Sequence, residues 1–210
     1  MCLPEIKPTR SELIKLKKKI KLADFGHSLL KKKRDGLVKE FFATLKEAKK
    51  SKSDLTENYL KAKTAIDLAR AVDGTATVRS ASFALKPKAN ITLETRNVMG
   101  VIVPKIHSQH RVEAFHERGY GVIGTSGYID DAAESHERVL GNIITAAETE
   151  TTLKKLLVAI DKTKRRVNAL EFNVIPRMNS EAKFVSLRLE ELERDDIFRL
   201  KKIKQKTRGN

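Results

Sequence analysis

Apolar residues recur at alternating three- and four-residue steps through about sixty residues near the start of this 210-residue chain. Stepping in this way from Leu13 to Val72 visits eighteen positions. Thirteen of them are apolar, whereas a composition that is 40% hydrophobic predicts about seven. The polar exceptions are His27, Arg34, Thr44, Ser51 and Asn58. A pattern of this period and length predicts a coiled-coil helix and not a helix of a compact globule.

Signals at both ends assign this first helix to residues 9–73. Pro8 stands just outside, and Thr9 and Glu12 have the spacing of a capping box. Gly74, directly after Asp73, is a typical helix stop. At 1.5 Å per residue the helix would be roughly 95 Å long, which exceeds the width of a globule made from a chain of this length.

Residues 74–130 interrupt the helical pattern and form an insert. We expect a short helix over 75–85, then a β-hairpin over about 90–104, because its residues alternate and are rich in β-branched side chains. The turn is expected near Arg96 and Asn97, and 105–128 is expected to be loop. A second long helix over 131–204 follows, with Asp131 and Glu134 at capping spacing, and 205–210 form a basic tail.

The two long helices are nearly equal in length and the insert between them is short. Folding back antiparallel would bury the apolar stripes of both helices against each other and bring residue ~10 beside residue ~200. The predicted fold is therefore mainly α: a long antiparallel two-helix left-handed coiled coil, with a small insert containing a β-hairpin at the end opposite the termini.

The net charge of +16 is concentrated at the two ends of the chain. Residues 1–40 carry twelve Lys and Arg against five Asp and Glu, and residues 194–210 carry seven against two. Together they hold +12, so an antiparallel fold predicts one strongly basic tip. Such charge is either a solvated face or a surface for an acidic partner, namely nucleic acid, an anionic membrane or an acidic protein cavity. Aromatic residues make up only 5% of the chain, which disfavours stacking on single-stranded bases.

Pro176 stands inside the second predicted helix, where it removes an N–H and would clash with the carbonyl of Phe172. The apolar positions around it are Leu170, Val174 and Met178, followed by Ala182, so that three four-residue steps occur in succession. This stutter locally unwinds a left-handed coil, and a proline is least damaging there. A mechanical bend and a tolerated irregularity are both compatible with this pattern.

Signals for chemistry are weak. "GYGVIG" at 119–124 fits G-x-G-x-x-G, but it lacks a preceding strand and an immediate helix, so a connector is favoured over a nucleotide site. His107, His110 and His116, with Glu113, lie in polar loop without cysteines, which argues against a zinc site. The spacing of the residues does not suggest a catalytic nucleophile beside a general base. We expect no catalytic residue, metal or cofactor.

The chain also lacks signals for secretion or membrane insertion. No apolar run approaches the ~20 residues that cross a bilayer, and the first residues lack the apolar core of a signal peptide. Cys2 is the single cysteine, which rules out an internal disulfide. These features predict a soluble, non-secreted protein.

Several stretches carry a family resemblance that runs through the whole chain in order. "PTRSELIKLKKKIKLADFGHSLLKKKRDGLVKEFF", "VMGVIVP" and "YGVIGTSGYIDDAAE" resemble the first helix, the hairpin and the beginning of the second helix in the D subunits of the archaeal and vacuolar-type rotary ATPases. "KTKRRVNALEFNVIPR" is the most specific match. Gly36 and Gly127 depart from the family pattern.

The resemblance implies a non-catalytic role as the central rotor shaft of an ATP synthase or ATPase that translocates protons or sodium ions. Implied partners are the hexamer of catalytic and non-catalytic subunits, the F subunit, and the funnel-shaped subunit on the membrane ring. The implied location is the cytoplasmic face of the membrane, without insertion into the bilayer. Nucleic acid is not an implied partner. The alternative is a free-standing basic coiled-coil scaffold or a nucleic-acid-binding rod.

Charge and position select the residues expected to face the hexamer. They are Arg10, Lys17, Lys18, Lys21, Arg199, Lys202 and Lys204, and Pro176 is the expected mechanical bend.

Overall fold

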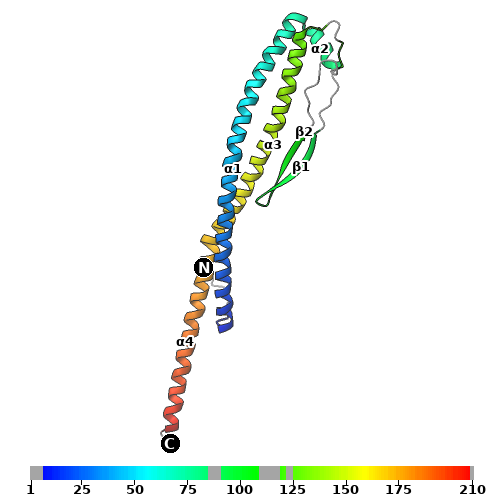
Figure 1. Cartoon of the computed structure of the whole chain (residues 1–210). Coiled ribbons are helices and arrows are strands. Elements are labelled where there is room, and N and C mark those ends of the chain that lie inside the picture. Colours follow the sequence, from blue (N-terminus) through cyan, green and yellow to red (C-terminus); the bar gives the residue numbers. More distant parts are fainter. Residues whose placement is uncertain (1–6, 85–90, 109–118, 122–124, 209–210) are drawn as a thin grey trace. The chain divides into compact units, whose positions relative to one another are not determined.

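The computed structural model describes residues 7–84, 91–108, 119–121 and 125–208, and the chain divides into two compact units. Unit 1 consists of residues 1–35 and 160–210, and unit 2 of residues 36–159. Paired long helices form most of each unit, and one small hairpin belongs to unit 2 (Figure 1). The expected fold class, a mainly helical coiled coil with a small hairpin insert, is confirmed.

Helix α1 spans Arg10–Asp73 and contributes to both units. Its start is capped as the sequence predicts, since the N–H of Glu12 donates to the hydroxyl of Thr9 at 3.2 Å. Its end is marked by Gly74, whose φ of 83° is accessible to glycine at little cost. Helix α2, Thr75–Ala84, follows directly.

Unit 2 closes where the end of α1 meets the start of α3, which spans Gly127–Ala169. The hydroxyl of Ser126 donates to the carboxylate of Asp73, and the N–H of Ile129 bonds the Ser126 carbonyl. The second long helix therefore begins four residues before the expected residue 131, because Ser126 and not Asp131 stands at its start. Small side chains form the core here, with Ala69, Ala81 and Ala132 buried around Ile129.

The hairpin consists of β1, Ile91–Val98, and β2, Val101–Ser108. It extends beyond the expected end at 104, and its turn lies at Met99 and Gly100 instead of Arg96 and Asn97. Pro104 does not end the strand because it lies opposite Thr95 at a position whose N–H would point out of the ladder. Residues 105–108, expected to be loop, belong to β2.

The turn is a tight one that contacts helix α1. Met99 and Gly100 have φ of 50° and 85°, the positive values that type I′ hairpin turns require, and the Gly100 N–H donates to the Asn97 side chain at 2.8 Å. The Met99 side chain reaches Gly36, where an added Cβ would lie 2.5 Å from its terminal carbon. Gly36 is thus the notch that accepts the hairpin turn.

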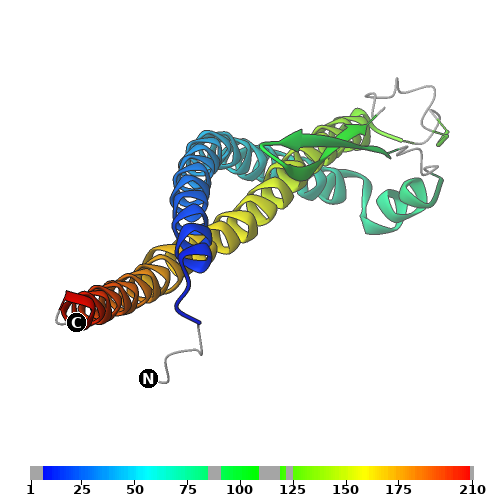
Figure 2. The same ribbon diagram turned by 90° about the horizontal axis from the view of Figure 1, so that it is seen from below.

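A second set of contacts fixes the hairpin against the helices of unit 2. Val103 is 3% exposed, and the backbone N–H of Ile106 donates to the carboxylate of Glu148 in α3 at 3.3 Å. The hairpin accordingly runs alongside α3 in both views (Figures 1 and 2). One face and one edge of the hairpin are engaged by these contacts.

Unit 1 pairs the first part of α1 with the end of α3, the π-helical turn η2 at Leu170–Val174, and helix α4 at Ile175–Arg208. The pairing is antiparallel, since Arg10 meets Glu193 and His27 meets Glu171. Val167 and Val185, on either side of the π-turn, are 1% and 0% exposed. The second long helix therefore keeps its buried stripe facing α1 before and after the irregular turn.

Candidate functional site at the basic helix ends and the π-turn

The start of α1 lies beside residue 193 of α4 and not beside residue ~200. The guanidinium of Arg10 bonds the carboxylate of Glu193 at 2.5 Å. Both side chains are largely exposed, so this pair contributes at most about 1 kcal/mol to stability. The charge of Arg10 is therefore offset by Glu193. Beyond this contact, α4 continues to Arg208 (Figure 1).

The last part of α4 carries most of the C-terminal charge on an exposed helix. Every side chain from Arg194 to Thr207 is exposed, including Arg199, Lys202 and Lys204. Large apolar side chains are exposed there as well, and their exposed fractions range from 54% to 65%; they are Ile197, Phe198, Leu200 and Ile203. The expected tip is therefore divided into two basic patches. One lies on α1, and the other lies on α4 beyond Glu193, where basic and apolar side chains are interspersed.

The α1 patch consists of Lys17, Lys18 and Lys21, which are all exposed. Glu12 lies one turn before it. A hydrogen bond from Lys15, together with the charge of the same ammonium group, holds the pKa of Glu12 below its ordinary value. Glu12 therefore remains ionised and partly offsets the local positive charge, while the three lysines stay available to an acidic partner.

The π-turn lies directly before Pro176. The N–H of Ile175 bonds the carbonyl of Leu170, five residues back, instead of that of Glu171. Three successive four-residue steps run ahead of the 3.5-residue coiled-coil repeat by about one and a half residues. A bond over five residues encloses one residue more than an α-helical bond, so the turn takes up most of this surplus. The local unwinding suggested by the sequence thus takes the form of a π-turn, and the mechanical role of Pro176 stays a prediction.

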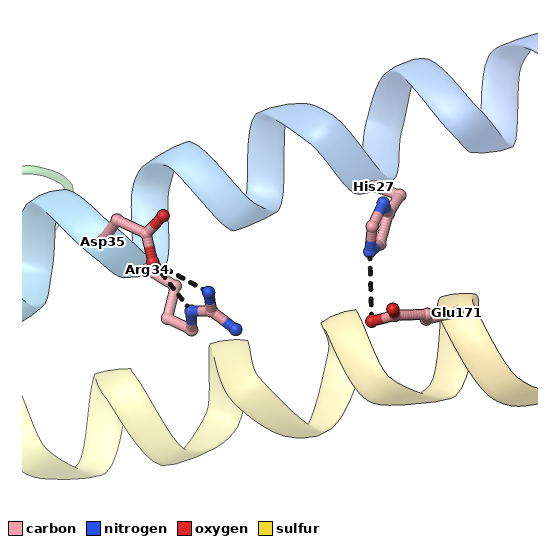
Figure 3. Close-up of polar contacts among 4 residues, drawn as sticks. All are labelled: His27, Arg34, Asp35 and Glu171. Carbon is pink, nitrogen blue, oxygen red and sulfur yellow. Dashed lines mark hydrogen bonds and ion pairs between the residues drawn. The ribbon is translucent and has the colours of Figure 1, made fainter.

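A polar pair crosses the helix interface at the π-turn. His27, one of the polar exceptions in the apolar pattern of α1, points its Nε2 at the carboxylate of Glu171, 3.5 Å away (Figure 3). The Nε2 atom is buried and makes no hydrogen bond. Arg34, another exception, donates to the carboxylate of Asp35 at 2.8 and 3.0 Å. The sequence pattern identified His27 and Arg34 as polar exceptions but not Glu171, which lies off the stepped apolar positions.

Replacing His27 with Leu is expected to raise the free energy of unfolding by about 1 kcal/mol. The substitution removes a buried nitrogen without a hydrogen bond and adds apolar burial at an interface position. Glu171 is half exposed and remains hydrated. Chemical denaturation measures the change, and Glu171→Gln, which removes only the charge, is the control. A loss of stability in the Leu variant would show that the contact between His27 and Glu171 outweighs apolar packing.

The side chains considered for a zinc site lie only partly within the described residues. Over 7–84, 91–108, 119–121 and 125–208, no group of three His, Cys, Asp or Glu side chains is arranged to hold a metal. His107 pairs with Glu94 across the hairpin at 3.1 Å, whereas His110, Glu113 and His116 lie outside the described residues. Part of the "GYGVIG" segment also lies outside them, and α3 begins only at Gly127.

Comparison with known proteins adds a decisive observation. The family model of the ATP synthase D subunit matches residues 12–205, which is nearly the whole chain. The chain belongs to the family of ATP synthase D subunits. The D subunit of the A-type ATP synthase of Methanococcoides burtonii is 56% identical over 96% of this chain and 98% of its own length. Those of Methanosarcina mazei and Archaeoglobus fulgidus are 52% and 46% identical, over 99% and 97% of this chain and 100% and 98% of theirs.

Membership of this family places the features above in a multi-subunit machine. The matched residues include both lysine patches, the hairpin, the π-turn and Pro176, and exclude Arg10. No described helix of this family member combines the length and hydropathy that a membrane span needs. The D subunit of an ATP synthase works in a complex with other subunits, so its exposed apolar and basic surfaces are candidate contacts with them.

Proposed function

We propose that this chain is the central-stalk rotor subunit of an A-type ATP synthase and has no active site of its own. It transmits torque between the membrane ring, through which protons or sodium ions pass, and the hexamer of catalytic and non-catalytic subunits. Its further partners are the F subunit and the funnel-shaped subunit on the ring. It acts at the cytoplasmic face of the membrane without entering the bilayer.

The observation that best supports this function is the register of the helix pair across the π-turn. Val167 and Val185 are both buried although the helix between them departs from regular winding. Two helices that keep their contact through an irregular turn resist relative twisting, because twisting one against the other would expose both side chains. Pro176 and the π-turn then give the rod its bend, while packing on either side carries the torque.

The basic patches are proposed to centre the rotor inside the hexamer. Lys17, Lys18 and Lys21 on α1, with Arg199, Lys202 and Lys204 on α4, are exposed and can face acidic groups of a surrounding sleeve. Arg10 supports the assembly less directly, because Glu193 already neutralises it. Flexible ammonium groups are strongly hydrated point charges, so they attract a partner without the fixed geometry of bidentate arginine pairs. Such contacts permit rotation.

Neutralising one lysine, as in Lys18→Gln, is expected to leave ATP turnover of the assembled complex nearly unchanged. Replacing Lys17, Lys18, Lys21, Lys202 and Lys204 together with Gln should weaken binding to the hexamer, most visibly at low salt, because high salt screens the attraction of the unsubstituted lysines as well. Binding and ATP hydrolysis are measured over a salt series. Unchanged assembly of the fivefold variant would identify the lysines as a solvated face, and a collapse after one substitution would exclude diffuse attraction.

Reversible cross-linking tests rotation directly. Cys2 is first replaced with Ser, and one cysteine is then placed at Lys204 and another on the catalytic subunit opposite it. Oxidation should stop steady-state ATP hydrolysis, and reduction should restore it, because a rotor tied to its housing cannot complete a turn. Complexes carrying only one of the two cysteines are the control. Full turnover in the cross-linked complex would exclude a rotor role.

A further inference from the structure

The hairpin of unit 2 has the face that carries its charged side chains toward the helices, and its uncharged, largely apolar face away from them. Val103 is buried and shares its face with Arg96 and Lys105. These two charged residues line a cavity of about 250 Å³ together with Glu40 and Glu148 of the two long helices. Alternation of side chains along a strand places the residues between them on the opposite face.

That opposite face is apolar and uncharged. The cross-strand register places Leu93 opposite Ile106 and Asn97 opposite Ile102. Leu93 is 71% exposed and Ile102 is 63% exposed. Ile91 extends the same surface, and Thr95 and Asn97 on it are polar but carry no charge. Pro104 is half-buried and also lines the cavity on the helix side. In a chain of net charge +16, an uncharged hairpin face of this kind departs from the rest of the lysine-rich surface.

An exposed apolar sheet face is a liability unless a partner covers it. Leaving Leu93 and Ile102 in water forgoes the favourable free energy that burying each side chain against a partner would supply. The absence of charge on this face specifies the chemistry of that partner. Any charged group placed against it would lose its hydration without gaining an ion pair.

The size of the face decides between a second copy and a different protein. Two strands of eight residues form a face of roughly 25 by 10 Å, or about 250 Å². A stable interface needs about 800 Å² on each partner, so two hairpins meeting face to face would not hold together by themselves. The occupant must therefore also be attached to this chain elsewhere, as a subunit of the same complex is.

We propose that the outer face of the hairpin, centred on Leu93 and Ile102, is a docking surface for an apolar, uncharged segment of another subunit of the ATP synthase. This inference rests on membership of a multi-subunit complex and not on torque transmission. The hairpin is preorganised for the contact. The Met99 side chain in the Gly36 notch and the Glu148 bond to Ile106 fix it against the helices, so its outer face is presented without further ordering.

The test compares lysine substitutions on the two faces of the hairpin. The probe is the set of soluble subunits of an A-type ATP synthase, produced together without this chain, and the titrated species is the full-length chain. Leu93→Lys and Ile102→Lys should each weaken binding by about ten- to a hundredfold. Thr92→Lys adds the same charge one residue away on the opposite face and should change binding by about twofold or less. The melting temperature of the isolated chain should be unchanged in all three variants.

Each contrary result overturns the proposal in a recognisable way. Equal binding by Leu93→Lys and Thr92→Lys would show that no subunit covers the face. A lowered melting temperature of the isolated Leu93→Lys chain would show that the chain covers the face itself. Dimers in sedimentation that Leu93→Lys dissociates would identify a second copy as the occupant. Binding and rotation are measured separately, so this inference and the rotor function can fail independently.

Discussion

Deleting residues 195–210 is expected to leave the stability of the isolated chain unchanged and to lower its affinity for the hexamer by more than tenfold. All side chains from Arg194 to Thr207 are exposed, so their removal costs little packing within the chain, within about 0.5 kcal/mol. The same deletion removes exposed apolar side chains, Leu200 and Ile203 among them, together with six Lys and Arg residues that a sleeve would contact. Burial of even one such apolar side chain accounts for a tenfold effect.

Thermal melts of the isolated chain and titration of the hexamer measure the two effects. The control is a chain that ends at Lys206, which keeps the apolar side chains and most of the charge and should bind as the full chain does. A marked fall in melting temperature after the longer deletion would show that the extension packs against the chain. Unchanged affinity would remove the end of α4 from the contacts proposed here.

Leu37→Ala is expected to lower the free energy of unfolding by about 2–5 kcal/mol. Leu37 is 0% exposed and is among the largest fully buried side chains in the described part of the chain. Truncating it loses transfer free energy and leaves a cavity that long helices can close only partly. Leu22→Ala on the same helix is the matched control, because Leu22 is 71% exposed and its truncation should cost less than about 0.5 kcal/mol.

Urea denaturation followed by circular dichroism measures both variants, and each unit can contribute its own transition, so the midpoints are compared transition by transition. Similar losses for the two substitutions would contradict the assignment of Leu37 to the interface between helices. A loss below about 1 kcal/mol for Leu37→Ala would show that the surrounding helices collapse onto the smaller side chain.

Sequence periodicity predicted the long helices well because buried residues recur along them at regular spacing. The stepped apolar positions of α1 include Leu16, Leu37, Ala62 and Ala69, all of which are buried. Thr9 caps the helix as its spacing to Glu12 indicated. Local signals were less reliable where several competed. The pattern at Asp131 and Glu134 suggested a helix start, but α3 begins at Gly127, directly after Ser126, whose hydroxyl donates to Asp73, a residue 53 positions away in the chain.

The hairpin shows a different limit of sequence reasoning. A proline at 104 suggests the end of a strand because proline removes an N–H, yet that N–H would have faced away from β1. The actual turn uses Met99 at positive φ, which is unfavourable for a side chain with a Cβ, and the contact with Gly36 offsets part of that cost. Such compensation depends on residues 63 positions apart and leaves no local signal.

That the selected basic residues face the hexamer stays a prediction, and the structure adds only where they lie. Charge counting selected exposed lysines, and the structure places Lys17, Lys18, Lys21, Lys202 and Lys204 on exposed surfaces. Charge counting could not determine how the two chain ends lie relative to each other. Their positions depend on the π-turn and on the register of α4 against α1, which place Arg10 beside Glu193. Glu171 was missed for a related reason, since its contact with His27 depends on the π-turn.

The part of α4 beyond Glu193 continues a helix that is already formed. Starting a helix from coil is costly, whereas adding a residue to an existing helix is nearly neutral, with an equilibrium constant of about 1–1.6 per residue. The number of helical residues in this segment should therefore fall gradually on warming and not in one cooperative step. Amide exchange should quicken steadily from Arg194 toward Arg208. In the proposed rotor role, such an end could change its helical length as it contacts successive subunits of the hexamer.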